Sequence, residues 1–220
     1  MDDRQQAEKV LQTVGENLHW VKVGLQSYLR DGPDLVRTIA DSGKKVFLDL
    51  KLHDIPNTMA KAMESLKSLP IGMLTLHAHA GEEALQRCAQ TGKDIMPDTL
   101  LLAVTVLTSM DQSALQAIGV KSPVLEQVER LAKVATNAGI GGIVCSPQEL
   151  MHLRASLPSS TKMVTPGIRP AGSDKGDQKR IMTPAQAKES GADYLVIGRP
   201  ILSADDPAEA LNNILGEMNP

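Results

Sequence analysis

Charged residues alternate with leucines in one segment of the sequence that is otherwise apolar. Asp49, Lys51 and Asp54 lie within the run VFLDLKLHD (46–54). Isolated buried charges are costly, but an alternating carboxylate–ammonium–carboxylate array keeps each group ionised through its neighbours. A buried ion pair that only supports the fold is the plainer interpretation, but apolar residues in its place often cost nothing. The array therefore favours an active site in which held charges act on a substrate.

Lys22 interrupts a second apolar run, WVKVG (20–24), at the end of a predicted strand. A lone lysine in this position can lay its stem along apolar surface and keep its ammonium group in water. If it lies near the first array, it can instead extend the charge network. The residues alone leave both interpretations open.

Two glycine–arginine turns follow later predicted strands. The sequence TPGIRP (165–170) follows one strand, and IGRP (197–200) follows the next. Gly167 and Gly198 allow close backbone approach, and Arg199 offers a planar fork of donors for phosphate oxygens. In a barrel, the loops after the last two strands commonly bind phosphate. A turn glycine beside a surface arginine is the alternative, but two such pairs at matching positions favour a phosphate site.

The segment between these turns (170–180) is polar, contains Gly172 and Gly176, and lacks an apolar period. This composition is typical of a mobile loop. Above a phosphate site such a loop can act as a lid. A plain surface loop is the alternative interpretation.

Apolar runs and amphipathic stretches alternate along the chain and must position these residues. The apolar runs predict strands at 20–24, 46–52, 72–79, 101–107, 142–145, 162–167 and 194–197. The amphipathic stretches predict helices at 5–14, 35–40, 58–69, 123–138 and 183–190, and Asp206 can cap a last helix that begins near Pro207. This alternation is typical of βαβ units and a parallel sheet.

The two-residue period of a strand gives the charged segment two faces. The apolar face suits the helix-covered outside of a barrel, and the charged face suits the interior near the carboxyl end, where barrel active sites lie. The first face comprises Val46, Leu48, Leu50 and Leu52, and the second comprises Phe47, Asp49, Lys51 and His53. Asp54 then begins the loop that follows the strand.

Histidines and cysteines give little sign of a metal site. His77 and His79 fall on one face of the strand predicted at 72–79, which suggests a metal pair, but a packing or supporting role is favoured. Cys88 and Cys145 lie far apart without metal-ligand spacing and are interpreted as ordinary buried thiols. We therefore expect no metal.

Composition sets the broad class of the protein. The 220 residues fit one larger domain, and (β/α) barrels commonly have this length. Hydrophobic residues make up 42% and aromatic residues only 2%, so the core must consist of aliphatic side chains, as in parallel sheets. The net charge of -3 argues against a nucleic-acid polymer as partner. With no membrane-length apolar run and no visible secretory leader, we expect a cytoplasmic enzyme.

We therefore predict one α/β domain over residues 1–220, built as a (β/α)8 TIM-type barrel. Seven strands are predicted where a barrel has eight, and the chain enters a helical pattern directly after MDDR (1–4). The first strand is thus expected to be lacking or altered. An open doubly wound sheet is the alternative on pattern alone, but the absence of GxGxxG after the first strand weakens a dinucleotide-binding fold.

Several motifs together resemble the orotidine 5′-monophosphate decarboxylase family. The run DLKLHDIPNT (49–58) is similar to the family signature, and LTS (107–109), TPGIR (165–169), DQ (177–178) and GRP (198–200) match later motifs in order. The Asp-x-Lys-x-x-Asp core alone is shared with other phosphosugar decarboxylases and synthases. The full set spans nearly the whole chain and is specific. It implies decarboxylation of orotidine 5′-monophosphate to uridine 5′-monophosphate in pyrimidine biosynthesis, without metal or organic cofactor.

The resemblance also implies catalytic roles. Lys51 would protonate C6 of the pyrimidine as carbon dioxide leaves, and Asp49 would lie beside the substrate carboxylate. Lys22 would bind ribose hydroxyls and hold Asp49 in the charge network. Asp54 would enter the site from a partner subunit, which implies a homodimer with shared active sites. Loss of carbon dioxide leaves a carbanion outside the ring π system, and a fixed ammonium group stabilises such a developing charge.

A set of substrate-binding residues follows from the same resemblance. It comprises Thr58, Thr108, Pro166, Arg169, Gln178, Gly198 and Arg199. Thr108 would contact the pyrimidine edge, and Gln178 would reach phosphate and base from the lid. The two arginines and the Gly198 backbone would serve the phosphate, whose binding energy can help to assemble the site.

The match departs from the family at its amino end. Family members usually begin with a strand that ends in Ala-Leu-Asp, and this Asp binds ribose. When the family pattern is counted back from Lys22, that Asp would lie just before Met1. Asp2 or Asp3 could substitute, but neither follows a strand. A start assigned at an internal methionine would explain this, and we then expect weakened stability and low or absent activity. Two alternatives stay open: a non-catalytic nucleotide-binding barrel, and a magnesium-dependent sugar-phosphate decarboxylase or synthase of the same superfamily.

Overall fold

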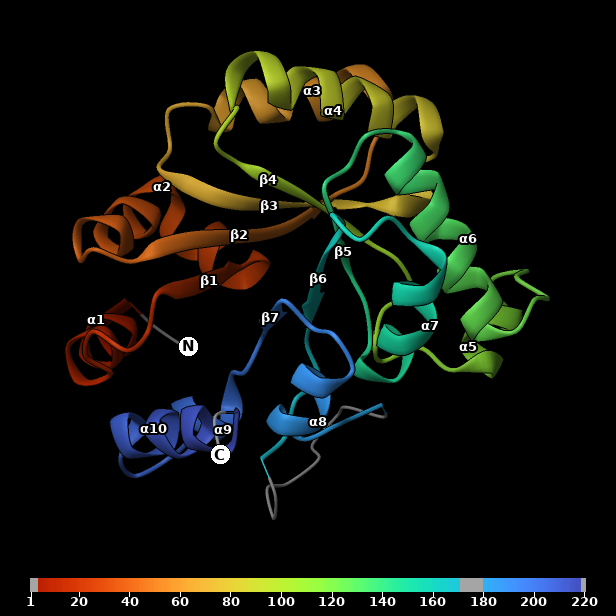
Figure 1. The fold of residues 1–220 in the computed structure, drawn as a ribbon. Coiled ribbons are helices and arrows are strands. Elements are labelled where there is room, and N and C mark those ends of the chain that lie inside the picture. Colours follow the sequence, from red (N-terminus) through yellow and green to blue (C-terminus); the bar gives the residue numbers. More distant parts are fainter. Residues whose placement is uncertain (1–3, 171–179, 219–220) are drawn as a thin grey trace.

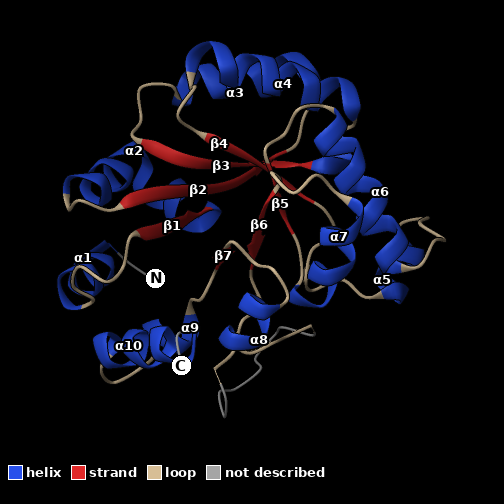
Figure 2. Cartoon of the chain, in the orientation of Figure 1, coloured by secondary structure: helices blue, strands red, loops and turns tan. Residues whose placement is uncertain are grey.

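A curled, all-parallel sheet forms the centre of the structure, and helices cover its outer side (Figure 1). The computed structural model describes residues 4–170 and 180–218. Each strand pairs with the next along the chain, in the order β1-β2-β3-β4-β5-β6-β7. Figure 2 shows the strands (red) inside a layer of helices (blue). This is the architecture of a (β/α)8 TIM-type barrel, with seven strands in the part that the structure describes.

The strands are β1 (Trp20–Gly24), β2 (Lys45–Leu52), β3 (Ile71–His77), β4 (Leu100–Val104), β5 (Gly142–Val144), β6 (Lys162–Thr165) and β7 (Tyr194–Leu195). All seven predicted strands are present. From β3 onwards each strand ends one to three residues before its predicted end, because pairing stops where the chain turns into the loops above the barrel. The 3-10 turns are η1 (Ala78–Ala80) and η2 (Pro147–Glu149).

The helices are α1 (Arg4–Thr13), α2 (Leu25–Asp41), α3 (Pro56–Leu66), α4 (Glu82–Ile95), α5 (Gln112–Ala117), α6 (Val124–Asn137), α7 (Leu150–Ser156), α8 (Pro184–Glu189), α9 (Arg199–Leu202) and α10 (Pro207–Met218). α2 is longer than the predicted 35–40, because it includes a second helical piece before a kink at Gly32 (φ 64), which Pro33 follows. The predicted cap of the last helix is confirmed. Asp206 Oδ1 accepts hydrogen bonds from the backbone N–H groups of Ala208 and Glu209, at 2.9 and 3.0 Å.

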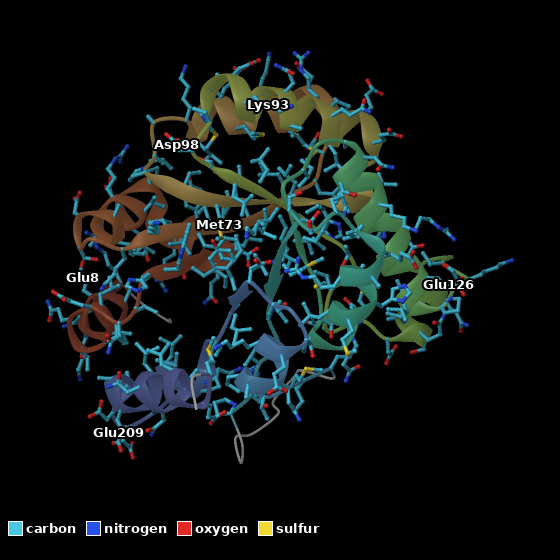
Figure 3. The ribbon with its side chains drawn as sticks, viewed as in Figure 1. Glu8, Met73, Lys93, Asp98, Glu126 and Glu209 are labelled. Atoms are coloured by element: carbon cyan, nitrogen blue, oxygen red, sulfur yellow. The ribbon has the colours of Figure 1, made fainter. Side chains whose placement is uncertain are left out.

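Two apolar layers confirm the predicted faces of β2. Val46 and Leu48 pack in the layer between the sheet and the helices. Phe47 packs inside the barrel with Met73, which Figure 3 labels at the centre of the molecule. The other buried members of this inner cluster are Leu102 and Val164. The charged end of β2 therefore continues the inner face of the barrel.

The barrel is open at the seam between β1 and β7. No pairing joins these two strands within the described residues, and their aromatic rings meet instead, with the centroids of Trp20 and Tyr194 5.8 Å apart. A mostly apolar cavity of about 730 Å³ lies along the seam. Beside it, Val14, the residue after α1, packs against Leu211 and Ile214 of α10. The described residues form seven strands with an open seam, which agrees with the prediction that the first strand of the barrel is lacking or altered. No helix in the described ranges has the length and apolarity needed to cross a membrane.

Candidate active site

Three charged side chains converge at the carboxyl ends of β1 and β2. Lys51 Nζ lies 2.8 Å from Asp49 Oδ1, and Lys22 Nζ lies 3.2 Å from Asp49 Oδ2. The hydroxyl of Thr75, on β3, donates to Asp49 Oδ1 at 3.0 Å. One carboxylate thus joins three adjacent strands. Of the two interpretations of Lys22, the structure supports the one in which it extends the charge network.

The electrostatics of this network favour an anionic ligand. Burial by itself raises the pKa of Asp49, but the ammonium groups of Lys22 and Lys51 outweigh it, and the pKa lies below the ordinary 3.8. The Asp49 side chain is 12% exposed, whereas those of Lys22 and Lys51 are 34% and 37% exposed. Two accessible ammonium groups around one buried carboxylate leave one positive charge in excess at the surface of the site.

The backbone of Lys51 adopts a left-handed conformation, with φ 53. No other non-glycine residue in the described ranges has a positive φ. The register between β2 and β3 shifts between Leu48 and Leu52, and Lys51 N donates to Thr75 Oγ1 at 2.8 Å. Such strain is usually found at functional sites. The two-residue period of the strand therefore predicts that Lys51 lies on the inner face of the barrel. The direction of its ammonium group, towards Asp49, also depends on the local irregularity of β2.

The strain at Lys51 can be measured by comparing two substitutions. Both Lys51→Gly and Lys51→Ala remove the ammonium group, but only glycine adopts a positive φ at no steric cost. We expect Lys51→Gly to be more stable than Lys51→Ala by about 1 kcal/mol, although glycine ordinarily destabilises the folded state. Urea unfolding of the two variants measures this difference. Equal stability, or a more stable alanine variant, would mean that position 51 is unstrained.

The two glycine–arginine turns line a second region of the site. A cavity of about 640 Å³ is bordered by Gly167, Arg169, Gly198 and Arg199, and by Lys22. Gly167 has φ 81, so its turn depends on the conformational freedom of glycine. Arg169 is 7% exposed, and its Nη1 donates to the carbonyl of Ile168 at 2.8 Å. The predicted pairing of both turns in space is thus present in the structure.

A smaller cavity lies over the ion-pair network. It measures about 150 Å³ and is lined by Asp49, Lys51, Thr108 and Cys145, among others. Three residues, Lys22, Pro166 and Val196, border both cavities. A ligand can therefore place an anionic group at the glycine–arginine turns and its reactive end against Lys51. Arginine guanidinium groups suit phosphate oxygens at the first position.

Three predicted site residues lie apart from these cavities or outside the description. Asp54 is exposed; its Oδ1 accepts a hydrogen bond from Ile55 N at 2.7 Å, and no ion pair in the described chain joins it to the network. Thr58, in the first turn of α3, is exposed and lines neither cavity. Gln178 and most of the predicted lid fall within 171–179, outside the described residues.

Three histidine rings gather beside Lys51. His77 Nδ1 and His79 Nδ1 are 3.3 Å apart, and the ring of His53 stacks on that of His77 with centroids 5.1 Å apart. The prediction that His79 belongs to the strand is wrong, because β3 ends at His77 and the turn η1 carries His79 back over it. Within residues 4–170 and 180–218, no three His, Cys, Asp or Glu side chains are grouped so as to hold a metal ion. The contacts that the structure shows for these rings are stacking and a short distance between ring nitrogens.

The histidine cluster makes stability depend on pH. Burial, and after it the electrostatic effect of three neighbouring side chains, lowers the pKa of His77 from 6.5 to about 4. Those neighbours are His79, His53 and Lys51. The unfolded chain thus binds this proton at a higher pH than the folded protein, and the free energy of unfolding falls as pH drops from 6.5 towards 4. We expect His77→Gln to flatten this slope in urea titrations. An unchanged slope would contradict the assignment.

Sequence analysis did not identify Thr75 as part of the ion-pair network. It is fully buried, and its hydroxyl links Asp49 to the backbone of Lys51. The sequence does contain an indication of this role, since Thr75 places a hydroxyl in the middle of the apolar run IGMLTLH. Gly24 was not singled out either, and a Cβ at this position would lie 3.0 Å from Lys22 Nζ. The two cysteines are buried free thiols, as predicted.

A parallel (β/α) barrel, a positive ion-pair network at the strand ends and adjacent glycine–arginine turns define an enzyme class. The class is that of barrel enzymes that act on small phosphorylated substrates. The model of the family described as "Orotidine 5'-phosphate decarboxylase / HUMPS family" matches residues 1–214, and the chain belongs to this family.

Named relatives and solved structures agree with this assignment. The orotidine 5'-phosphate decarboxylase of Opitutus terrae is 52% identical over 209 residues, which cover 95% of this chain and 91% of that protein. The protein of the same name from Pseudoalteromonas translucida is 48% identical, with 97% and 92% covered. The crystal structure of orotidine 5'-phosphate decarboxylase from Lactobacillus acidophilus has a TM-score of 0.87 and 36% identity, covering 100% of this chain and 96% of that one.

Proposed function

We propose that this chain decarboxylates orotidine 5′-monophosphate to uridine 5′-monophosphate, a step of pyrimidine biosynthesis. The observation that carries the proposal is the Lys22–Asp49–Lys51 network, which borders a cavity that adjoins the two glycine–arginine turns. The names of the relatives point to the same reaction and do not favour the two alternatives, a sugar-phosphate enzyme or a non-catalytic barrel.

Lys51 has the central role in the proposed mechanism. The bond between C6 and the carboxylate breaks, carbon dioxide leaves, and the electron pair stays on C6. The ammonium group of Lys51 stabilises this charge and donates a proton to C6, then regains a proton from solvent. The ionised carboxylate of Asp49 holds that ammonium group at 2.8 Å before the reaction begins. No electron sink in the pyrimidine is needed, because the charge is stabilised by a group held in place.

Remote groups would bind the rest of the nucleotide. Arg199, Arg169 and the backbone of Gly198 would bind the phosphate, and Pro166 would lie between the two cavities. Lys22 would contact the ribose, and Thr108 would contact the pyrimidine edge. Binding energy gained at the phosphate can then be used to place C6 against Lys51.

One assay tests the proposed function. Orotidine 5′-monophosphate is added in the presence of a chelator, and the loss of its absorbance is followed. We expect turnover that survives the chelator. Turnover only with magnesium, or only with a sugar phosphate, would contradict the proposal. Binding of uridine 5′-monophosphate without turnover would contradict the proposal and would indicate a non-catalytic barrel.

The proposal includes a homodimer in which Asp54 and Thr58 act on the partner's site. Both residues are exposed and lie outside the cavities of their own chain, next to exposed Ile55 (66% exposed). Mixing inactive Lys51→Ala and Asp54→Asn subunits should then restore up to about a quarter of wild-type activity, since half of randomly mixed dimers carry one intact site. No recovery in mixtures that exchange subunits would contradict shared sites.

The proposal also places the protein in the cytoplasm. The free thiols Cys88 and Cys145 are in keeping with a reducing compartment, although buried thiols resist oxidation anywhere. Fractionation of cells that produce the chain tests this location, and recovery in a secreted or membrane fraction would contradict it.

A further inference from the structure

An ion pair beside the active site has no part in the mechanism above. The guanidinium group of Arg180 pairs with the carboxylate of Glu149, whose side chain is only 3% exposed. The second carboxylate oxygen, Oε2, accepts a hydrogen bond from Ser146 N at 2.8 Å. Arg180 itself is 14% exposed, and its Nε is buried without a hydrogen-bond partner in the described residues. Removing two charges from water costs free energy, and a buried ion pair offsets this cost only if its geometry is good and further hydrogen bonds are made.

The pair joins two turns that form one side of the smaller cavity. Arg180 Nη2 donates to the carbonyl of Leu107 at 3.2 Å. Leu107 and the adjacent Thr108 line the cavity over Lys51, and so does Cys145, which precedes Ser146. Arg180 and Glu149 thus connect the turn after β4 to the turn after β5. A shift of either turn would move the surface against which the pyrimidine would lie.

The backbone close to Arg180 is paired with the first glycine–arginine turn. Arg169 N donates to the carbonyl of Met182 at 3.0 Å, and Met182 N donates to the carbonyl of Gly167 at 3.4 Å. Ile168 and Met182 form a parallel bridge. Residues 180–182 therefore contact the pyrimidine end of the site through a side chain and the phosphate end through the backbone.

We propose that Arg180, held by Glu149, is a positioning residue that fixes the pyrimidine-side turns relative to the phosphate-side turn. It acts without touching the substrate, and the inference rests on the proposed function. A misplacement of about 1 Å by a residue remote from the chemistry can lower activity about 100-fold. An apolar pair would fill the same space but would not bond to Leu107 or Ser146.

A matched ion pair at the other end of the barrel provides the control. Arg154 pairs with Asp193, and their side chains are 26% and 23% exposed. This pair lies where β7 begins, and neither residue lines the cavity over Lys51.

At a temperature where all variants are folded, we expect Arg180→Met to lower kcat/KM about 10- to 100-fold, with both a higher KM and a lower kcat. Arg154→Met should lower the Tm but change kcat/KM less than about threefold. An equal loss in both variants would overturn the proposal.

Two further variants separate positioning from stability. The double variant Glu149→Leu/Arg180→Met removes both charges, so the Tm should recover towards wild type while kcat/KM stays low. Recovery of kcat/KM together with the Tm would overturn the proposal. Arg180→Lys keeps a charge for Glu149 but lacks the second arm to Leu107, so we expect it to restore the Tm more than kcat/KM. Equal recovery of both would also overturn it.

Measuring the affinity for uridine 5′-monophosphate tests the positioning role separately from the proposed function, because binding can be measured without turnover. If the wild type does not turn over orotidine 5′-monophosphate, the proposed function fails, but nucleotide affinity still reports on the position of the turns. We expect Arg180→Met to weaken that affinity about tenfold and Arg154→Met to leave it unchanged. Unchanged affinity and unchanged kcat/KM in Arg180→Met would overturn the positioning role alone.

Discussion

Lys51→Ala is expected to lower kcat for orotidine 5′-monophosphate by at least about 10³-fold, because it removes both the proton donor and the fixed charge at C6. The affinity for uridine 5′-monophosphate should change less than about tenfold, since most of the nucleotide contacts lie elsewhere. Steady-state kinetics and equilibrium binding of the product measure the two effects. In the proposed mechanism, kcat and product affinity respond differently because Lys51 would act on charge that develops only during the reaction.

A lysine on the outer layer supplies the control for this variant. Lys61 lies on α3 and is exposed, so Lys61→Ala should keep wild-type kcat. Asp49 keeps its contacts to Lys22 and Thr75 when Lys51 is removed, and the barrel should still fold. Turnover by Lys51→Ala within about tenfold of wild type would defeat the assigned role, because a general acid or a fixed charge contributes more than that.

Arg199→Ala is expected to lower kcat/KM about 10²- to 10³-fold, because the phosphate would lose a charged partner in a partly enclosed site. The decisive comparison uses orotidine, which lacks the phosphate. Its much slower turnover should be the same in Arg199→Ala and in the wild type. The difference between the two substrates then isolates the contact between the side chain and the phosphate group.

Arg130 provides the matched control for the phosphate variant. It is an exposed arginine on α6, and Arg130→Ala should leave kcat/KM for both substrates unchanged. An equal loss with orotidine and its monophosphate in Arg199→Ala would mean that Arg199 supports the fold or the pyrimidine end instead. The phosphate would then have to be assigned to Arg169 and the backbone of Gly198.

Local patterns were enough to predict the seven strands, six of the helices and the faces of β2, but α4, α5, α7 and α9 were not predicted. The alternation of Phe47 and Leu48 between the inner and outer apolar layers follows from the two-residue period of a strand. The two glycine–arginine turns were predicted because both follow strands, and parallel strands end at the same edge of a sheet. Strand ends were less well predicted, since apolar residues such as Val106 and Leu107 continue past the end of β4 at Val104.

Contacts between distant segments could not be predicted in this way. Thr75 reaches Asp49 across 26 residues, and Arg180 reaches Glu149 across 31. Neither pairing has a local period, because it depends on which strands become neighbours as the sheet curls. The left-handed backbone of Lys51 is also set by its neighbours, since an isolated lysine would avoid that conformation.

The sequence by itself determined the class of the barrel, the charged strand and the two turns, because each depends on residue type and short spacing. The tertiary structure decided which charges meet. It placed Lys22 beside Asp49, kept Asp54 out of the described ion-pair network of its own chain, and joined the turn after β4 to the first glycine–arginine turn through residues 180–182. These arrangements depend on how far each strand is staggered against the next, which is a property of the whole curled sheet and not of any single segment.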